Sequence, residues 1–171
     1  MTTLNLSVQS TSLLVATLLT GLSAGILFTW ANAVTTGLAR LDAFGYLRAF
    51  QQMNRTILNP AFFIVFVGPG FVSLVVAFLY RSQSNLLFVL LLIAAALYFL
   101  GVLLPTGAGN IPLNNILEKA DLAKISLQDA QSLRTQFEVR WNNFHLIRTI
   151  CATLSFGLLL LITQLTKQPG I

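Results

Sequence analysis

Four stretches of the sequence are each long and apolar enough to cross a bilayer, and they restrict the possible folds more than any other feature. A hydrocarbon core about 30 Å thick needs roughly 20 apolar residues in helical form. The stretches cover about residues 13–34, 60–80, 86–104 and 146–165. Charged residues make up only 9% of the chain, whereas a soluble domain carries about 25%. We therefore predict an all-α fold, a four-transmembrane-helix bundle that forms a single integral membrane domain over residues 1–171.

The connections between these spans differ in length. Residues 81–85 leave room only for a tight hairpin, whereas residues 35–59 and 105–145 form long connections that hold most of the charge. We predict helical extensions in both long connections. Ser126-Leu-Gln-Asp129 resembles a capping box, in which a side-chain oxygen caps the first turn, so the fourth helix is expected to begin near Leu127.

The helix expected over residues 41–58 is amphipathic. Its polar side chains fall within about a 100° sector, and a set of large apolar side chains lies opposite. Such a helix suits the headgroup region or the mouth of the bundle. The polar set is Arg48, Gln51, Gln52 and Arg55, and the apolar set is Tyr46, Phe50, Met53 and Ile57.

The distribution of Lys and Arg predicts the orientation of the bundle. Eight of the ten cations lie in or beside the two long connections, which the positive-inside rule places in the cytoplasm, with both termini outside. All five acidic residues lie there too, so the net excess falls from eight to three. The overall charge of +5 does not indicate nucleic-acid binding, because no basic surface interleaved with aromatic residues is present.

Three spans contain polar or small residues that need an explanation, and one does not. In the first span Gly21, Gly25, Thr29 and Asn32 share a face, which favours close helix packing. In the second, the sequence at 68–70 is Gly-Pro-Gly, which predicts either a simple kink or a widened cavity. The third span has no polar side chain beyond a tyrosine at 98, so we expect it to be the most lipid-exposed helix, without chemistry of its own.

The fourth helix carries the strongest constellation. Arg134, Glu138, Trp141, His145 and Arg148 are spaced four, three, four and three residues apart, which places them within about 80° on one face. Such groups near membrane depth either snorkel to the interface or face a bundle interior. For Arg134 and Glu138 a surface ion pair or snorkelling is favoured, whereas for His145 and Arg148 both interpretations stay open.

The supply of metal ligands and redox groups is small. Cys151 is the single cysteine and His145 the single histidine, so neither an internal disulfide nor a multi-histidine metal centre can form within one chain. No Gly-x-Gly-x-x-Gly segment is present for a flavin or a nicotinamide cofactor. We therefore predict no metal and no cofactor.

Three motifs give the chain a family resemblance. Residues 51–62 read Gln-Gln-Met-Asn-Arg and then, from 59, Asn-Pro-Ala-Phe; residues 110–114 read Asn-Ile-Pro-Leu-Asn; and Trp141 is followed by His145 and by Arg148-Thr149. In order and spacing these resemble the anthrone oxygenase family of four-span membrane proteins. The resemblance implies oxidation of an anthrone-like aromatic molecule to a quinone by O₂, apparently without metal or flavin.

The resemblance also suggests roles for the polar residues. An imidazole has an ordinary pKa of about 6.5, so His145 is the expected general base, and Arg148 would stabilise the enolate oxygen. Trp141 would stack on the flat substrate. The other expected substrate-binding residues are Asn54, Asn110, Asn114 and Glu138, the last being the next candidate base. The alternative is a non-catalytic membrane protein that binds or passes a small lipophilic ligand, or supports a partner membrane protein. In either case membrane lipid surrounds the chain.

Overall fold

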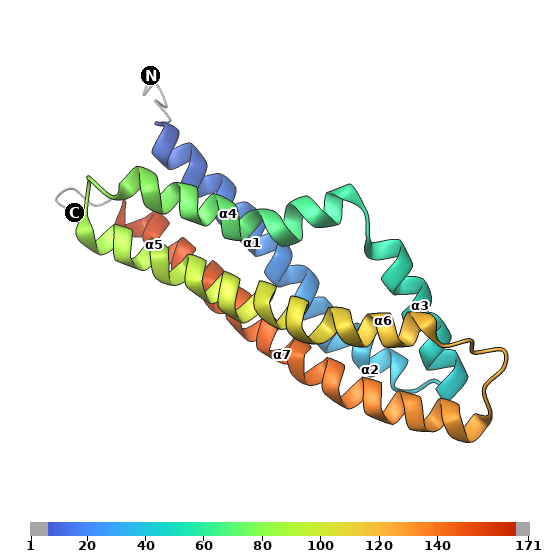
Figure 1. Cartoon of the computed structure of the whole chain (residues 1–171). Coiled ribbons are helices and arrows are strands. Elements are labelled where there is room, and N and C mark those ends of the chain that lie inside the picture. The colour runs from blue at the N-terminus through green and yellow to red at the C-terminus, as the bar shows by residue number, and fades with distance from the viewer. Residues whose placement is uncertain (1–6, 167–171) are drawn as a thin grey trace.

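The computed structural model describes residues 7–166, and that part of the chain contains helices and short connections without any strand. Four helical rods are long and apolar enough to cross a membrane, so the predicted all-α four-helix bundle with helical extensions is confirmed (Figure 1). The first rod comprises α1 (Val8–Thr29), the π-helical turn η1 (Trp30–Val34) and α2 (Thr35–Leu38). The short helix α3 (Ala43–Ile57) leads to the second rod, α4 (Pro60–Tyr80). The third rod comprises α5 (Asn85–Tyr98), the π-helical turns η2 (Phe99–Leu103) and η3 (Thr106–Asn110), and α6 (Ile111–Lys119), and the fourth is α7 (Leu127–Leu165).

Side-chain caps fix where several of these helices begin. Asp42 accepts from the backbone N–H of Gly45 at the start of α3, and Asn59 accepts from that of Phe62 at the start of α4. Ser126 accepts from the N–H of Asp129, so the predicted start of α7 at Leu127 is confirmed. Each cap satisfies a backbone donor that the first turn leaves unpaired.

The third rod continues beyond its predicted end at Leu104. Pro105 has no N–H to donate and would ordinarily interrupt the helix. Here the backbone pairing widens to the π pattern on both sides of it, where Leu104 bonds to the carbonyl of Phe99 and Ile111 bonds to that of Thr106. The rod therefore absorbs the proline and carries its polar C-terminal half toward α7.

The prediction that the third span is the most lipid-exposed helix is wrong. In its most apolar window 39% of the residues are buried, as in the first rod, against 33% in the second and fourth. Small residues explain the difference, because Ala94 and Ala95 are buried and a side chain at Gly101 would overlap Cys151. The absence of a side chain there lets the third and fourth rods approach closely.

The packing face of α1 also differs from the expected one. Gly25, Thr29 and Asn32 are exposed, and only Gly21 is packed, against the ring of Phe156. The face that is buried lies beside the predicted one and uses slightly larger residues at helical spacing. It consists of Leu13, Ala16, Thr17, Thr20, Ser23, Ala24 and Leu27.

The Gly-Pro-Gly sequence of the second span serves packing. Helix α4 runs through Pro69 without a break, and Gly70 lies against the ring of Phe99 on the third rod. The cavity extends along α4 only as far as Val67, and none of the residues at 68–70 lines it, so this sequence does not itself form the cavity wall.

Tyr98 joins three rods beside that cavity. Its hydroxyl donates to the carbonyl oxygen of Phe66 on α4 at 2.8 Å and accepts from Ser23 on α1 at 2.6 Å. We expect Tyr98→Phe to lower the free energy of unfolding by about 1–3 kcal/mol, because it leaves a buried carbonyl and a buried hydroxyl unpaired. Thermal unfolding in detergent measures this. The matched control is Tyr80→Phe, since Tyr80 is also buried but its hydroxyl has no partner among residues 7–166. Equal melting temperatures for the two variants would contradict the expectation.

Candidate functional site

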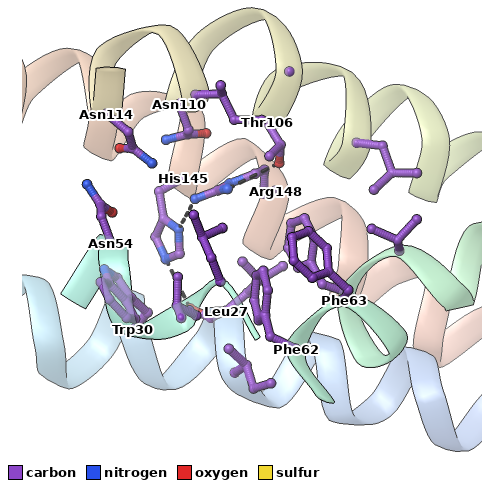
Figure 2. Close-up of a pocket in the computed structure, with 18 of the residues that line it drawn as sticks. Leu27, Trp30, Asn54, Phe62, Phe63, Thr106, Asn110, Asn114, His145 and Arg148 are labelled. Atoms are coloured by element: carbon purple, nitrogen blue, oxygen red, sulfur yellow. Dashed lines mark hydrogen bonds between the residues drawn. The ribbon is translucent and has the colours of Figure 1, made fainter. Parts of the chain in front are cut away.

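A cavity of about 280 Å³ lies at the corner between α3 and α4 (Figure 2). All four rods and α3 contribute to its wall, which is mostly apolar. The polar side chains in the wall are few and come from different helices. The lining residues are Ile26, Leu27, Trp30, Asn54, Ile57, Leu58, Phe62, Phe63, Phe66, Val67, Leu103, Thr106, Gly107, Asn110, Ile111, Asn114, Trp141, His145 and Arg148.

All three π-helical turns of the described chain meet at this cavity. Trp30 comes from η1, Leu103 from η2, and Thr106 and Asn110 from η3. A π turn inserts an extra residue and changes which side chains face inward, and such turns occur frequently at functional sites. The distorted parts of the first and third rods therefore contribute Trp30, Thr106 and Asn110 to the polar part of the wall.

His145 is buried and both of its ring nitrogens are engaged. Nδ1 lies 2.8 Å from Nη2 of Arg148, and Nε2 lies 3.1 Å from the carbonyl oxygen of Leu27. A guanidinium can only donate, so Nδ1 accepts, and Nε2 must then carry the proton that it donates to Leu27. The hydrogen bonds thus define a neutral imidazole whose only lone pair points at Arg148.

Arg148 is a buried cation, 6% exposed, without a carboxylate partner in residues 7–166. Its Nη1 donates to Thr106 Oγ1 at 3.1 Å, and its guanidinium lies 5.2 Å from the centre of the Trp141 ring. Its Nε–H is buried and has no acceptor in that part of the chain. A buried charge is costly unless it is paired and hydrogen-bonded. This guanidinium is therefore suited to an oxygen-bearing or anionic ligand in the cavity.

Two of the predicted asparagines hold Trp141 in place. The indole N–H of Trp141 donates to Asn114 Oδ1 at 2.8 Å, and Asn110 Nδ2 donates to the carbonyl oxygen of Trp141 at 3.1 Å. The indole stacks on His145 with ring centres 4.9 Å apart. In the structure these two asparagines orient the aromatic wall, whereas their direct contact with a substrate stays a prediction.

Asn54 lies at the cavity, but Glu138 does not. The Asn54 amide nitrogen is buried and has no acceptor among the described residues. Glu138 accepts from Nε of Arg134 at 2.8 Å, so the expected ion pair forms, but both side chains are partly buried rather than at the surface. Glu138 is not a lining residue. Arg134 also donates to the carbonyl oxygens of Leu41 and Ala39, which fastens α7 to the turn before α3.

The predicted polar face of α3 is partly buried. Gln51 is buried, and its Nε2 donates to the carbonyl oxygens of Leu117 and Ala120 at the end of α6. Arg55 forms an ion pair with Glu118 at 2.7 Å beside it. Gln51 was expected at the surface, but the exposed carbonyls of a helix end need donors, and its amide supplies them. These contacts fasten α3 to the end of α6.

The cavity mouth is defined by the four large apolar lining residues that are also exposed, Ile26, Leu58, Phe63 and Ile111. These residues line the cavity and are also exposed on the outside of the bundle, by 37%, 64%, 49% and 48% respectively. None carries a charge or a hydrogen-bonding side chain. The mouth therefore offers an apolar entrance next to the start of α4, the second predicted span.

Several lining residues could not be predicted from the sequence, because they lie on helices other than α7, which carries the polar stripe. Trp30, Phe62, Phe66 and Thr106 gave no periodic polar signal of their own. The Asn59-Pro60 sequence marked the start of α4, one turn from Phe62, but it did not show which side of that helix faces inward. An unexplained tryptophan in the last third of the first span was the only available signal for Trp30.

The fold and the cavity define a helical membrane protein with a buried, ligand-sized polar site. A comparison with protein-family models matches residues 61–158 to the anthrone oxygenase family. This match covers more than half of the chain, and the chain therefore belongs to the anthrone oxygenase family. The matched segment contains Asn110, Asn114, Trp141, His145 and Arg148, whereas Trp30 and Asn54 precede it. No curated protein and no solved structure matches the chain.

Proposed function

We propose that this protein oxidises an anthrone-like aromatic molecule to a quinone with O₂, using Arg148 and His145 in the cavity. The observation that carries the proposal is a buried guanidinium with no carboxylate partner in residues 7–166, hydrogen-bonded to a neutral imidazole inside a mostly apolar cavity. An anthrone becomes an enolate when it loses a proton, and the negative oxygen of that enolate is a suitable partner for Arg148. Membership of the family supports this substrate class.

The size and shape of the cavity support a flat ligand. Its volume of about 280 Å³ lies near the lower end of the range for small-molecule sites, about 300–1,000 Å³. Phe62 and Phe66 stack on each other in the wall from α4, and Trp141 and His145 stack in the wall from α7. Flat aromatic faces from two helices favour a ligand of a few fused rings.

The first chemical step is removal of a proton from the methylene carbon opposite the substrate carbonyl. His145 Nδ1 is the acceptor, and its lone pair becomes available when Arg148 turns its N–H groups from the imidazole to the substrate oxygen. The electron pair of the broken C–H bond moves into the ring system and leaves the charge on that oxygen. Arg148 stabilises this charge as it develops. Such electrostatic stabilisation by positioned donors is usually the largest single contribution to an enzyme's rate enhancement.

The second step uses O₂ as the oxidant. The enolate gives one electron to O₂, and the resulting carbon radical and superoxide combine at the former methylene carbon. The peroxide takes up a proton and then loses water: the second C–H proton leaves, the O–O bond breaks and a second carbonyl forms. Overall, one anthrone and one O₂ give one anthraquinone and one water, and the substrate supplies all four electrons.

A second candidate function is ligand binding without chemistry. It is favoured by the hydrogen bond from Arg148 to His145 Nδ1, which occupies the lone pair that a general base needs. In this case the cavity would bind a lipophilic molecule with an acidic or carbonyl oxygen and release it unchanged.

The experiment that separates the two functions is turnover by the purified protein in phosphatidylcholine nanodiscs. We expect added anthrone to be consumed together with O₂ in a ratio of one to one, with quinone absorbance rising at the same rate and well above that of empty nanodiscs. Tight binding of anthrone with no oxidation above the empty-nanodisc rate would establish the binding function instead.

A further inference from the structure

Unpaired polar atoms are concentrated at the cavity. Six buried side-chain nitrogen or oxygen atoms have no hydrogen-bond partner in residues 7–166, and four of them belong to lining residues. Two of these four atoms, Nε of Arg148 and the amide oxygen of Asn110, belong to the polar group around Trp141 and His145. The other two are the indole nitrogen of Trp30 and the amide nitrogen of Asn54.

Trp30 and Asn54 form a second polar position in the wall. They come from η1 and α3, whereas Arg148 comes from α7 and its partner Thr106 from η3. Figure 2 shows Trp30 and Asn54 on one side of His145, and Arg148 with Thr106 on the other. A ligand that fills the cavity therefore meets donors at two separated places, with the His145 imidazole between them.

Neither the Trp30 N–H nor the Asn54 NH₂ makes a hydrogen bond that stabilises the fold within residues 7–166. The Trp30 ring is fixed by aromatic contacts with Phe50 and Trp141, at 6.2 and 6.1 Å between centres, and these do not involve its N–H. The Asn54 nitrogen makes no hydrogen bond among the described residues. Buried donors are ordinarily paired, and a buried unpaired one is destabilising. Donors that are buried and unpaired in a cavity wall are therefore suited to a ligand acceptor.

We propose that Trp30 Nε1–H and the Asn54 amide bind the oxygen that O₂ adds to the substrate. This inference rests on the proposed function. In an anthrone the methylene carbon lies across the central ring from the carbonyl carbon. A substrate whose carbonyl oxygen meets Arg148 thus directs that methylene carbon toward the opposite wall. The two donors would stabilise the peroxide formed there and then accommodate the second carbonyl of the quinone.

The test compares two ligands under argon, where no oxidation takes place. Anthrone has one oxygen and anthraquinone has two, on opposite edges. Dissociation constants are measured in nanodiscs by quenching of tryptophan fluorescence, since both tryptophans of the chain line the cavity. We expect Trp30→Phe and Asn54→Leu each to reduce the preference for the quinone over anthrone by about five- to tenfold, the effect of losing one hydrogen bond. Trp141 remains as the reporter in Trp30→Phe.

The matched control is Asn142→Leu. Asn142 also has a buried amide atom without a partner in the described chain, but it does not line the cavity, so the ligand preference should be unchanged. An unchanged preference in Trp30→Phe and Asn54→Leu would overturn the proposal and indicate that water satisfies these donors. Failure of both ligands to bind the unmodified protein would overturn it as well.

Thermal unfolding of the empty protein separates a binding role from a structural one. We expect Asn54→Leu to unfold at the same temperature as the unmodified protein or a higher one, because the substitution removes an unpaired buried amide. A clear fall in this temperature would assign Asn54 to the fold and overturn its binding role. Because all these measurements exclude O₂, a changed ligand preference supports the second oxygen site even if the protein shows no turnover in air. If the protein oxidises anthrone in air but both variants keep the preference for the quinone, the oxidation is supported and the second oxygen site is contradicted.

Discussion

Arg148→Gln is expected to lower kcat/KM for anthrone oxidation by about 100- to 1,000-fold, the loss found when a donor that stabilises a developing oxyanion is removed. The guanidinium of Arg148 is the only charged group among the residues that line the cavity. The enolate oxygen would consequently lose its only positive partner. Initial rates of quinone formation in nanodiscs, over a range of anthrone concentrations, give the value.

Arg148→Lys is the matched variant because it keeps the charge. Arg148 contacts Thr106 and His145 with two different nitrogens at 3.1 and 2.8 Å, and a single ammonium cannot reproduce that planar arrangement. We expect Lys to restore only a small part of the rate. The midpoint temperature of thermal unfolding should not fall greatly in Arg148→Gln. The substitution removes a buried charge that has no carboxylate partner in residues 7–166. A near-normal rate in Arg148→Gln would remove the guanidinium from the mechanism.

His145→Gln is expected to lower kcat by about 100-fold or more, within the range of about 10²–10⁴ that general acid–base catalysis contributes. Glutamine has an oxygen to accept from Arg148 and an NH₂ to donate toward Leu27, so it can replace both hydrogen bonds of the imidazole. It cannot take up a proton at neutral pH. The variant therefore removes the base while preserving the hydrogen bonds.

His145→Ala removes the hydrogen bonds together with the base, and comparison of the two variants separates these roles. If His145→Gln turns over normally while His145→Ala does not, the imidazole only positions Arg148. Glu138→Gln tests the other candidate base from the sequence. Because the Glu138 carboxylate pairs with Arg134 outside the set of lining residues, we expect it to affect the rate far less than His145→Gln does.

The sequence predicted well those features that depend on one helix at a time. Apolar stretches located the four rods, and the Ser126 cap located the start of α7. Helical spacing placed Trp141, His145 and Arg148 on one face, and all three line the cavity. These predictions succeed because the periodicity of a single helix fixes which of its side chains share a side.

Features that depend on how two rods meet could not be predicted. The π turns around Pro105 bring Thr106 to Arg148, and neither the turns nor the contact has a distinct sequence signal. Gln51 looked like a surface residue because its burial depends on the end of α6. Trp30 is the first residue of the π-helical turn η1, and the sequence contains no distinct signal for that turn.

Because the cavity mouth is apolar and exposed, the ligand concentration that matters for this protein is the one within the lipid. A ligand that enters past Leu58 and Phe63, next to the start of α4, can arrive directly from solution in the lipid acyl chains. Its supply then depends on the mole fraction of ligand among the lipids, which hydrophobic partitioning raises far above its level in water. Diluting the vesicles with extra phospholipid at constant total ligand should slow the protein, whereas adding buffer should have little effect.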